Sequence, residues 1–226
     1  MTIARRVTAL NNMGVQSLQS GRFECAILSF RHAIELVNTL HFESNGITEP
    51  YHKLPLIRVP LTFTQEVNMI AVSPSNTVDV FSSAFALPKI QSLSNVALQV
   101  PGVILYNLGL AYQMMGLFTQ DKSFERLLEA HRCYKLCMAA VFNHRNEGGH
   151  IPLDCYAVLC GALTNMGHIL SHCCRTNEAN GCIKNLETIL ETTDAFQYLD
   201  DEESEFFFST TLFVQYHHQC NAAPAA

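Results

Sequence analysis

Charged residues are scarce in this 226-residue chain, because Asp, Glu, Lys and Arg make up 15% of it against about 25% in an average soluble domain. Hydrophobic residues make up 48%, which excludes a disordered or highly solvated chain. An excess of bases is also missing: 14 Lys and Arg against 20 Asp and Glu give a net charge of -6. Without that excess, the electrostatic attraction that dominates nucleic-acid binding is absent. We therefore expect a folded protein that does not bind nucleic acid.

Long apolar runs are missing as well. The best window, residues 96–112, is interrupted by polar residues and by Pro101 and Gly102, so we expect no membrane span. Arg5 and Arg6 are followed by polar asparagines and not by the apolar stretch of a secretory signal. We therefore place the chain in the cytoplasm, with the nucleus as the alternative, and expect its nine cysteines to be reduced.

Catalytic and metal-binding motifs are absent too. The chain has no G-x-S-x-G nucleophile turn and no glycine-rich phosphate loop, so we expect no enzyme activity. His168 and His172 are four residues apart and could share a helix face, but the adjacent Cys173 and Cys174 would point about 100° apart. We therefore expect no bound metal and no cofactor. A metal- or redox-responsive thiol protein built on His168, His172 and Cys173 stays open as the alternative.

Three segments, residues 9–14, 104–109 and 162–167, share an Asn, then Met or Leu, then Gly. In the first copy, apolar residues recur after Gly14 at three- and four-residue spacing, which predicts two successive helices. The predicted break falls at Ser20 and Gly21, because glycine readily adopts the left-handed conformation that ends a helix.

This spacing resembles the tetratricopeptide repeat, a helix-turn-helix unit of about 34 residues. The resemblance implies a mostly α fold, an α-α superhelix of about three helix pairs with a long insertion that is irregular or forms a β-hairpin. In the second copy the alanine of the second helix comes about nine residues late, and in the third copy the register of the second helix is ambiguous. The residues implied to pack where paired helices cross are Gly14, Ala26, Phe30, Ala33, Gly109, Ala130, Tyr134 and Gly167. The arrangement, including the Ala-rich residues 222–226, also resembles helical-repeat proteins of algae, and that likeness implies no function.

The copies begin 95 and 58 residues apart, so insertions separate them. Residues 54–61 and 77–85 have alternating or β-branched sequences with prolines, which favours a small hairpin. The resulting organisation is repeat 1 at 1–40, the insertion at 41–100, repeat 2 at 101–142, a loop and repeat 3 at 143–198, an acidic linker with a C-terminal capping segment at 199–216, and a disordered tail at 217–226. The acidic run 200–205 is interpreted as a solvated linker or as a docking site for a basic partner.

The resemblance also implies a function, because the first helices of stacked repeats line a concave surface that holds a peptide or a partner helix. Carried over residue by residue, the implied ligand-facing positions are Asn11, Val15 and Leu18, then Tyr106, Leu110 and Gln113, then Thr164, His168 and Ser171. None of them is Lys or Arg, so an apolar or mixed ligand is favoured over an acidic one. We expect a protein-binding scaffold or adaptor, and we keep two alternatives: the thiol protein above and a self-associating structural protein. An inserted segment that fills the groove is an equal alternative to an open groove.

Overall fold

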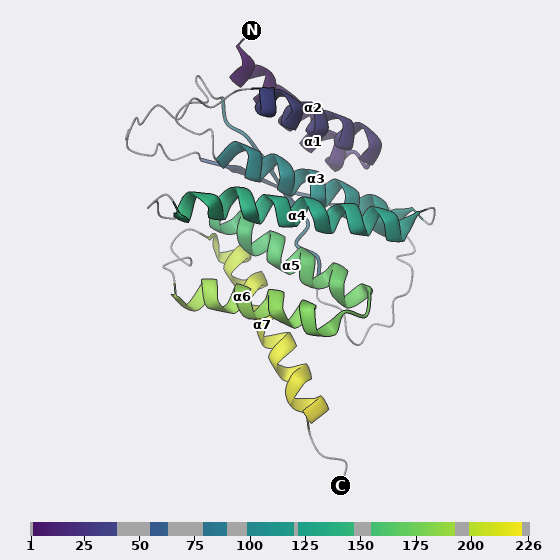
Figure 1. The fold of residues 1–226 in the computed structure, drawn as a ribbon, viewed down its shortest axis with the longest axis vertical. Coiled ribbons are helices and arrows are strands. Elements are labelled where there is room, and N and C mark those ends of the chain that lie inside the picture. Colours follow the sequence, from purple (N-terminus) through teal and green to yellow (C-terminus); the bar gives the residue numbers. More distant parts are fainter. Residues whose placement is uncertain are drawn as a thin grey trace.

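The computed structural model is mostly helical, with seven α-helices and one small sheet among its described residues, 2–39, 55–62, 79–89, 99–119, 122–146, 155–192 and 199–222 (Figure 1). Side chains are described as far as Phe142 in the fourth helix and Leu212 in the seventh. The helices are α1 (Ile3–Gln19), α2 (Phe23–Thr39), α3 (Gln99–Phe118), α4 (Ser123–Asn146), α5 (Tyr156–His172), α6 (Thr176–Thr192) and α7 (Asp201–Ala222). They pack in chain order, each against the next, and the two ends of the chain lie at opposite ends of the stack (Figure 1). The prediction of a mostly α protein is confirmed.

Two short strands pair antiparallel, β1 (Ile57–Pro60) and β2 (Ser83–Ala86). Ile57 lies opposite Ala86, and Pro60 lies opposite Ser83. The strands overlap the two segments from which a hairpin was predicted. Residues 63–78, which would connect them, lie outside the described part of the chain. β2 also contacts α1 and α3, so the sheet lies against the odd-numbered helices.

The helices form three consecutive pairs, and the turns of the first and third pairs are alike. Gly21 has a φ of 68° between α1 and α2, as the sequence predicts, and Cys174 has a φ of 56° between α5 and α6. In both turns the same two backbone bonds close the helix end: Gly21 N–H donates to Leu18 O and Arg22 N–H to Ser17 O, with the equivalent bonds at residues 174 and 175. Lys122 has a φ of 55° at the turn between α3 and α4.

A glycine of the first helix meets a large side chain of the second helix in every pair. A Cβ on Gly14 would overlap the Phe30 ring, and one on Gly109 would lie 2.9 Å from the Tyr134 ring. A Cβ on Gly167 would lie 3.1 Å from Ile183, which settles the ambiguous register of the third pair. Ala179 of α6 is therefore the counterpart of the alanines predicted to pack in the other pairs. All the predicted packing residues are buried: Gly14, Ala26, Phe30, Ala33, Gly109, Ala130, Tyr134 and Gly167.

The extra residues of the second pair lengthen both of its helices. α3 extends about one turn further beyond Gly109 than α1 does beyond Gly14. α4 begins about one turn earlier before Ala130 than α2 does before Ala26. Adding about a whole turn to each helix leaves the crossing residues on the same faces.

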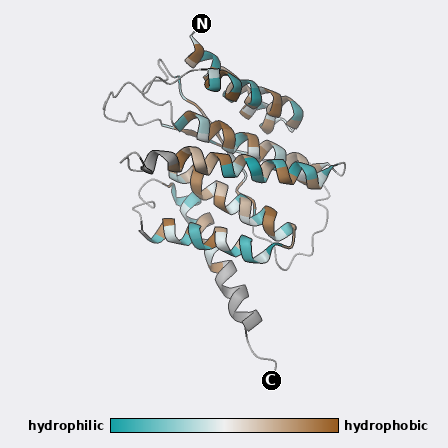
Figure 2. Ribbon diagram, viewed as in Figure 1, coloured by the Kyte–Doolittle hydropathy of each residue, from teal (hydrophilic) through white to brown (hydrophobic). Residues whose placement is uncertain are grey.

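α3 and α5 are the most apolar helices of the stack. α3 and α5 are mostly brown in Figure 2, and nearly all their residues are buried, whereas α6 presents more hydrophilic residues. No helix in the described ranges is both long enough and apolar enough to cross a membrane.

The acidic residues near the C-terminus begin a helix instead of forming a linker. Asp200 Oδ1 accepts the Glu203 N–H at 2.8 Å, and Glu203 Oε2 accepts the Asp200 N–H at 3.1 Å, which is a reciprocal cap. Asp201, Glu202 and Glu203 occupy the first turn, where negative charge is favourable. α7 contacts α5 and α6 and continues to Ala222, into the range predicted to be a disordered tail.

Candidate functional site

The nine predicted ligand-facing residues lie on α1, α3 and α5, and eight of them are buried. The exception is Ser171, which is half-buried near the end of α5. These residues therefore present little surface to solvent in this structure. The buried members are Asn11, Val15, Leu18, Tyr106, Leu110, Gln113, Thr164 and His168.

An inserted segment of the same chain lies on part of this surface, where it contacts Asn11 and Tyr106. Residues 81–87, which include β2, run along α1, α3 and α5 and are held there by three asparagines, one from each helix. We call Asn12, Asn107 and Asn165 the asparagine ladder. They occupy the same position in the three sequence copies, as the shared Asn before the packing glycine.

Each ladder asparagine binds the N–H and the C=O of one residue. Asn12 accepts from Leu87 N–H at 2.9 Å and donates to Leu87 O at 2.9 Å. Asn107 accepts from Phe85 N–H at 2.9 Å and donates to Phe85 O at 2.7 Å. The equivalent bonds of Asn165 to Phe81 measure 2.8 and 3.2 Å. One side-chain amide thus matches the N–H and the C=O of one residue in the segment, and the match occurs three times.

Neighbouring polar groups complete the ladder. Asn107 Nδ2 also donates to Asn11 Oδ1 at 2.9 Å, and Asn11 Nδ2 donates to Phe85 O at 3.1 Å. The Tyr106 hydroxyl lies 3.1 Å from Ser83 O and 3.3 Å from Phe81 O. Asn11 and Tyr106 are predicted ligand-facing residues, and the structure brings both to the inserted segment. Thr164, the third residue at this position, has a buried Oγ1 without a hydrogen-bond partner.

A second chain of hydrogen bonds runs from the ladder into the core. Asn165 Nδ2 donates to the Tyr134 hydroxyl at 3.0 Å, and Tyr134 donates to Gln113 Oε1 at 2.8 Å. Gln113 Nε2 then lies 3.2 Å from His168 Nδ1, which must accept, because the amide oxygen of Gln113 is already the acceptor for Tyr134. Burial, with a smaller effect of His172, lowers the pKa of His168 to about 4, so the ring is neutral at pH 7.

β1 and α7 hold the other side of the inserted segment. Leu61 N–H donates to Ser82 O at 2.9 Å. The main-chain N–H and C=O groups of even-numbered residues in the segment therefore point towards β1, and those of odd-numbered residues point towards the ladder. Arg58 of β1 binds Asp200 at 2.6 Å and Glu202 at 3.1 Å near the start of α7. The acidic run therefore docks a basic residue of the same chain. The Phe81 ring packs against Phe207, with centroids 4.8 Å apart.

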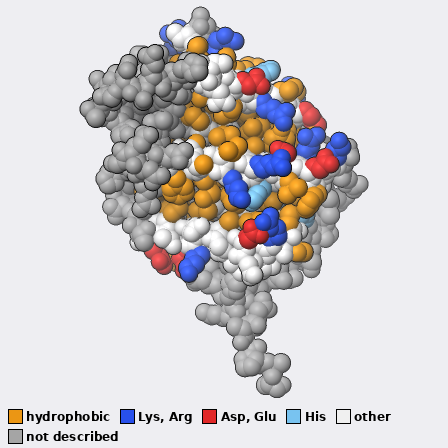
Figure 3. Space-filling model, in the orientation of Figure 1, with side chains coloured by type: hydrophobic (Ala, Val, Ile, Leu, Met, Phe, Trp, Pro, Cys, Tyr) orange, Lys and Arg blue, Asp and Glu red, His pale blue; other side chains and the backbone are white. Residues whose placement is uncertain are grey.

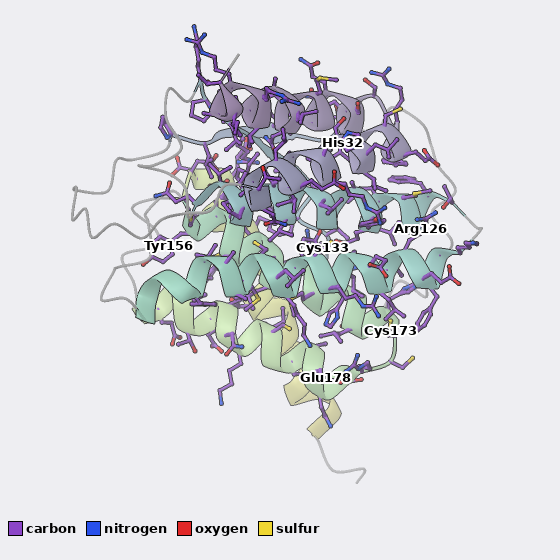
Figure 4. All side chains as sticks on the ribbon, turned by 45° about the horizontal axis from the view of Figure 1, so that its top comes forward. His32, Arg126, Cys133, Tyr156, Cys173 and Glu178 are labelled. Carbon is purple, nitrogen blue, oxygen red and sulfur yellow. The ribbon has the colours of Figure 1, made fainter. Side chains whose placement is uncertain are left out.

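The described cysteines are separate from any grouped metal ligands. Among the residues that the structure describes, no group of three His, Cys, Asp or Glu could hold a metal ion. Figure 4 shows Cys133 within α4 and Cys173 beyond the end of α5, well separated. Burial raises the pKa of Cys133 to about 12 and that of Cys182 to about 11, which disfavours the reactive thiolate. Cys174 occupies the left-handed position of the turn after α5.

Charge is mixed on the face drawn in Figure 3. Lys and Arg side chains alternate there with Asp and Glu among apolar side chains, and no large patch of one sign is seen. That face offers no concentrated charge of one sign to a partner.

The sequence contained a signal for the ladder that the predicted ligand-facing positions missed. Asn12, Asn107 and Asn165 form part of the shared motif, yet the predicted positions lie one residue earlier, at Asn11, Tyr106 and Thr164. A polar residue repeated within apolar helices has to find a hydrogen-bond partner, which was the available clue. Gly161, which contacts the Phe81 ring, had no such signal, because it lies outside the motif.

Known proteins offer no match to this arrangement: the chain matches no protein-family model, no curated protein and no solved structure.

Proposed function

We propose that the protein is a non-catalytic scaffold or adaptor that holds an extended polypeptide against α1, α3 and α5. The fold that we propose for this task is a right-handed superhelix of three tetratricopeptide-like helix pairs. Three features support it: the glycine contacts that recur in each pair, the similar turns, and the contacts among alternate helices α1, α3, α5 and α7.

The observation that carries the proposal is the asparagine ladder. Three equivalent side chains bind main-chain groups, which every polypeptide possesses, at Phe81, Phe85 and Leu87. A helix surface that only needed to be covered could be covered by apolar packing. Side-chain amides that each match the N–H and C=O of one residue, two of them buried and one half-buried, instead favour a surface built for an extended strand.

The alternatives find less support in the described residues. A thiol or metal protein would need grouped ligands or a cysteine with a lowered pKa, and Cys133 and Cys182 are shifted the other way. Self-association finds some support in α7, where Phe208 and Leu212 are 51% and 47% exposed and four residues apart. We propose the cytoplasm or the nucleus as the compartment of the scaffold.

Native mass spectrometry of the protein purified gently from its own cells tests the proposal. One spectrum reports subunit number, bound metal and any retained polypeptide. A heteromer without metal is expected, and a zinc-loaded monomer or a homodimer alone would contradict the scaffold and favour one of the alternatives.

The partner would then be located with matched variants. Asn107→Ala alters the ladder, whereas Met13→Ala changes a side chain that is 55% exposed on α1. If the partner occupies the ladder surface, its affinity changes with Asn107→Ala and stays the same with Met13→Ala. The reverse result would place the partner on the outer surface.

A further inference from the structure

The helices contact the side chains of the inserted segment as well as its backbone. Phe81, Ser83, Phe85 and Leu87 are all buried, at 3%, 4%, 2% and 1% exposure. Of the even-numbered residues between them, Ala84 is also buried, whereas Ser82 and Ala86 are half-buried. Because side chains alternate along a strand, these four residues share one face. The ladder therefore fixes the backbone, and the surroundings of these four residues determine which side chains fit.

The surroundings of Phe81 are shaped for an aromatic ring. A Cβ on Gly161 of α5 would lie 2.6 Å from Phe81 Cδ1, so the absence of a side chain there makes room for the ring. Phe206 and Phe207 of α7 pack against the ring with centroids 5.4 and 4.8 Å away. A smaller residue in place of Phe81 would leave this space unfilled.

The next positions have different requirements. Phe85 packs on Tyr106, with ring centroids 5.3 Å apart. Ser83 lies between the two aromatic residues, close to both the Tyr106 hydroxyl and Arg58. The Leu87 side chain is buried, and its backbone is bound by Asn12. The pattern is aromatic, small, aromatic and aliphatic at every second residue.

The contacts that pair the helices do not involve the inserted segment directly, although Tyr134 also binds the ladder residue Asn165. The helices of each pair pack through Gly14 with Phe30, Gly109 with Tyr134 and Gly167 with Ile183, and none of these residues belongs to the segment. On its outer side the segment is held by four-residue β1 and by Arg58, which lies 3.8 Å from the buried Glu203 and whose closer partners Asp200 and Glu202 are 54% and 81% exposed. Exposed ion pairs of this kind are weak and screened by salt. Release of the segment would therefore leave the glycine contacts within each helix pair in place.

We propose that residues 79–89 are an internal stand-in for the partner, and that the partner is an extended polypeptide with the same alternating pattern, which displaces them from the ladder. This inference rests on the proposed function and names the class of polypeptide that the scaffold holds. The internal segment competes at the high effective concentration of a tethered ligand, so the intact chain binds the partner only weakly until the segment is loosened.

A fluorescent peptide with the sequence of residues 79–89 provides the test. Its control has the same composition, with the residues of positions 81 and 82 exchanged and those of positions 85 and 86 exchanged, which moves both aromatic residues to the other face. Binding is measured by fluorescence anisotropy to the wild-type chain and to the loosened variant Phe85→Ala. We expect saturable 1:1 binding to the variant, roughly tenfold or more weaker binding to the wild type, and none of the control peptide. Adding Asn107→Ala to the variant should weaken binding.

Several outcomes would overturn the inference. Equal binding of the two peptides would show that the alternating pattern is not read, and no binding to a folded loosened variant would show that the segment is fixed. Arg58→Gln is the second loosened variant, and circular dichroism checks the folding of both. Loss of helical signal in both variants would show that the helices depend on the segment. A heteromer seen by native mass spectrometry together with a negative peptide result would overturn this inference alone and leave the scaffold standing.

Discussion

Asn107 is the most informative side chain to remove, because it is fully buried at the centre of the ladder. In Asn107→Ala the Phe85 N–H loses its acceptor in a buried site, which costs about 1–3 kcal/mol. Asn11 Oδ1 loses its donor as well, which costs about 1 kcal/mol more. Phe85 O keeps its bond from Asn11 Nδ2. We therefore expect the free energy of unfolding to fall by about 3 kcal/mol in total.

Urea unfolding followed by circular dichroism measures this change, with Asn177→Ala as the control. Asn177 is an exposed asparagine in the first turn of α6, and its replacement should change the free energy of unfolding by less than about 0.5 kcal/mol. Hydrogen exchange supplies a second readout: amides of residues 81–87 should exchange faster in Asn107→Ala, whereas those of α6 should not. A loss below about 1 kcal/mol, with unchanged exchange at 81–87, would refute the ladder as the main anchor of the segment.

Three further predictions concern the helix crossings, the turns and the buried histidine. Gly109→Val should cost more than about 2 kcal/mol, because its Cβ would lie 2.9 Å from a Tyr134 ring that is fixed by hydrogen bonds; an unchanged midpoint of thermal unfolding would contradict the crossing. Gly21→Ala should destabilise and Cys174→Gly should stabilise, each by about 1 kcal/mol, because both positions have a left-handed φ; urea midpoints that move in the same direction would speak against this explanation. The pKa of His168 is about 4 in the folded chain, below its ordinary value of 6.5, so its contribution to stability is complete above pH 6.5 and is lost as the pH falls towards 4, by about 3 kcal/mol. Urea unfolding between pH 7.5 and 4.5 should therefore show a flatter dependence on pH in His168→Gln, and equal slopes would rule this contribution out.

The helix pairs could be predicted from the sequence because their signals are local. The spacing of Gly14, Gly21 and Phe30 lies within one helix pair, and the left-handed turn at Gly21 follows from the freedom of glycine to adopt it. The register of α6 was harder to predict, because Ile183 takes the place of an aromatic residue at the crossing. Aliphatic and aromatic side chains can both fill such a space, so the sequence pattern is degenerate there.

The occupied surface could not be predicted in the same way. Asn12 and Leu87 are 75 residues apart, and Asn165 and Phe81 are 84 apart. No local spacing rule links such distant residues, and an open surface would have produced the same helix periodicity. The start of α7 could not be predicted from charge alone, because a solvated acidic run and a helix cap have the same charge. The reciprocal bonds of Asp200 and Glu203 make it a cap.

The hydrogen bonds behind the ladder also fix the orientation of its side-chain amides. Asn165 Nδ2 is tied to the Tyr134 hydroxyl and Asn107 Nδ2 to Asn11 Oδ1, so neither amide can turn over without losing a bond. Each therefore offers its oxygen to an N–H and its nitrogen to a C=O in a fixed order. A strand that entered with its ends exchanged would meet these groups the wrong way round. Residues 81–87 run from α5 towards α1, against the order of the helices, and the proposed partner would have to run in the same direction.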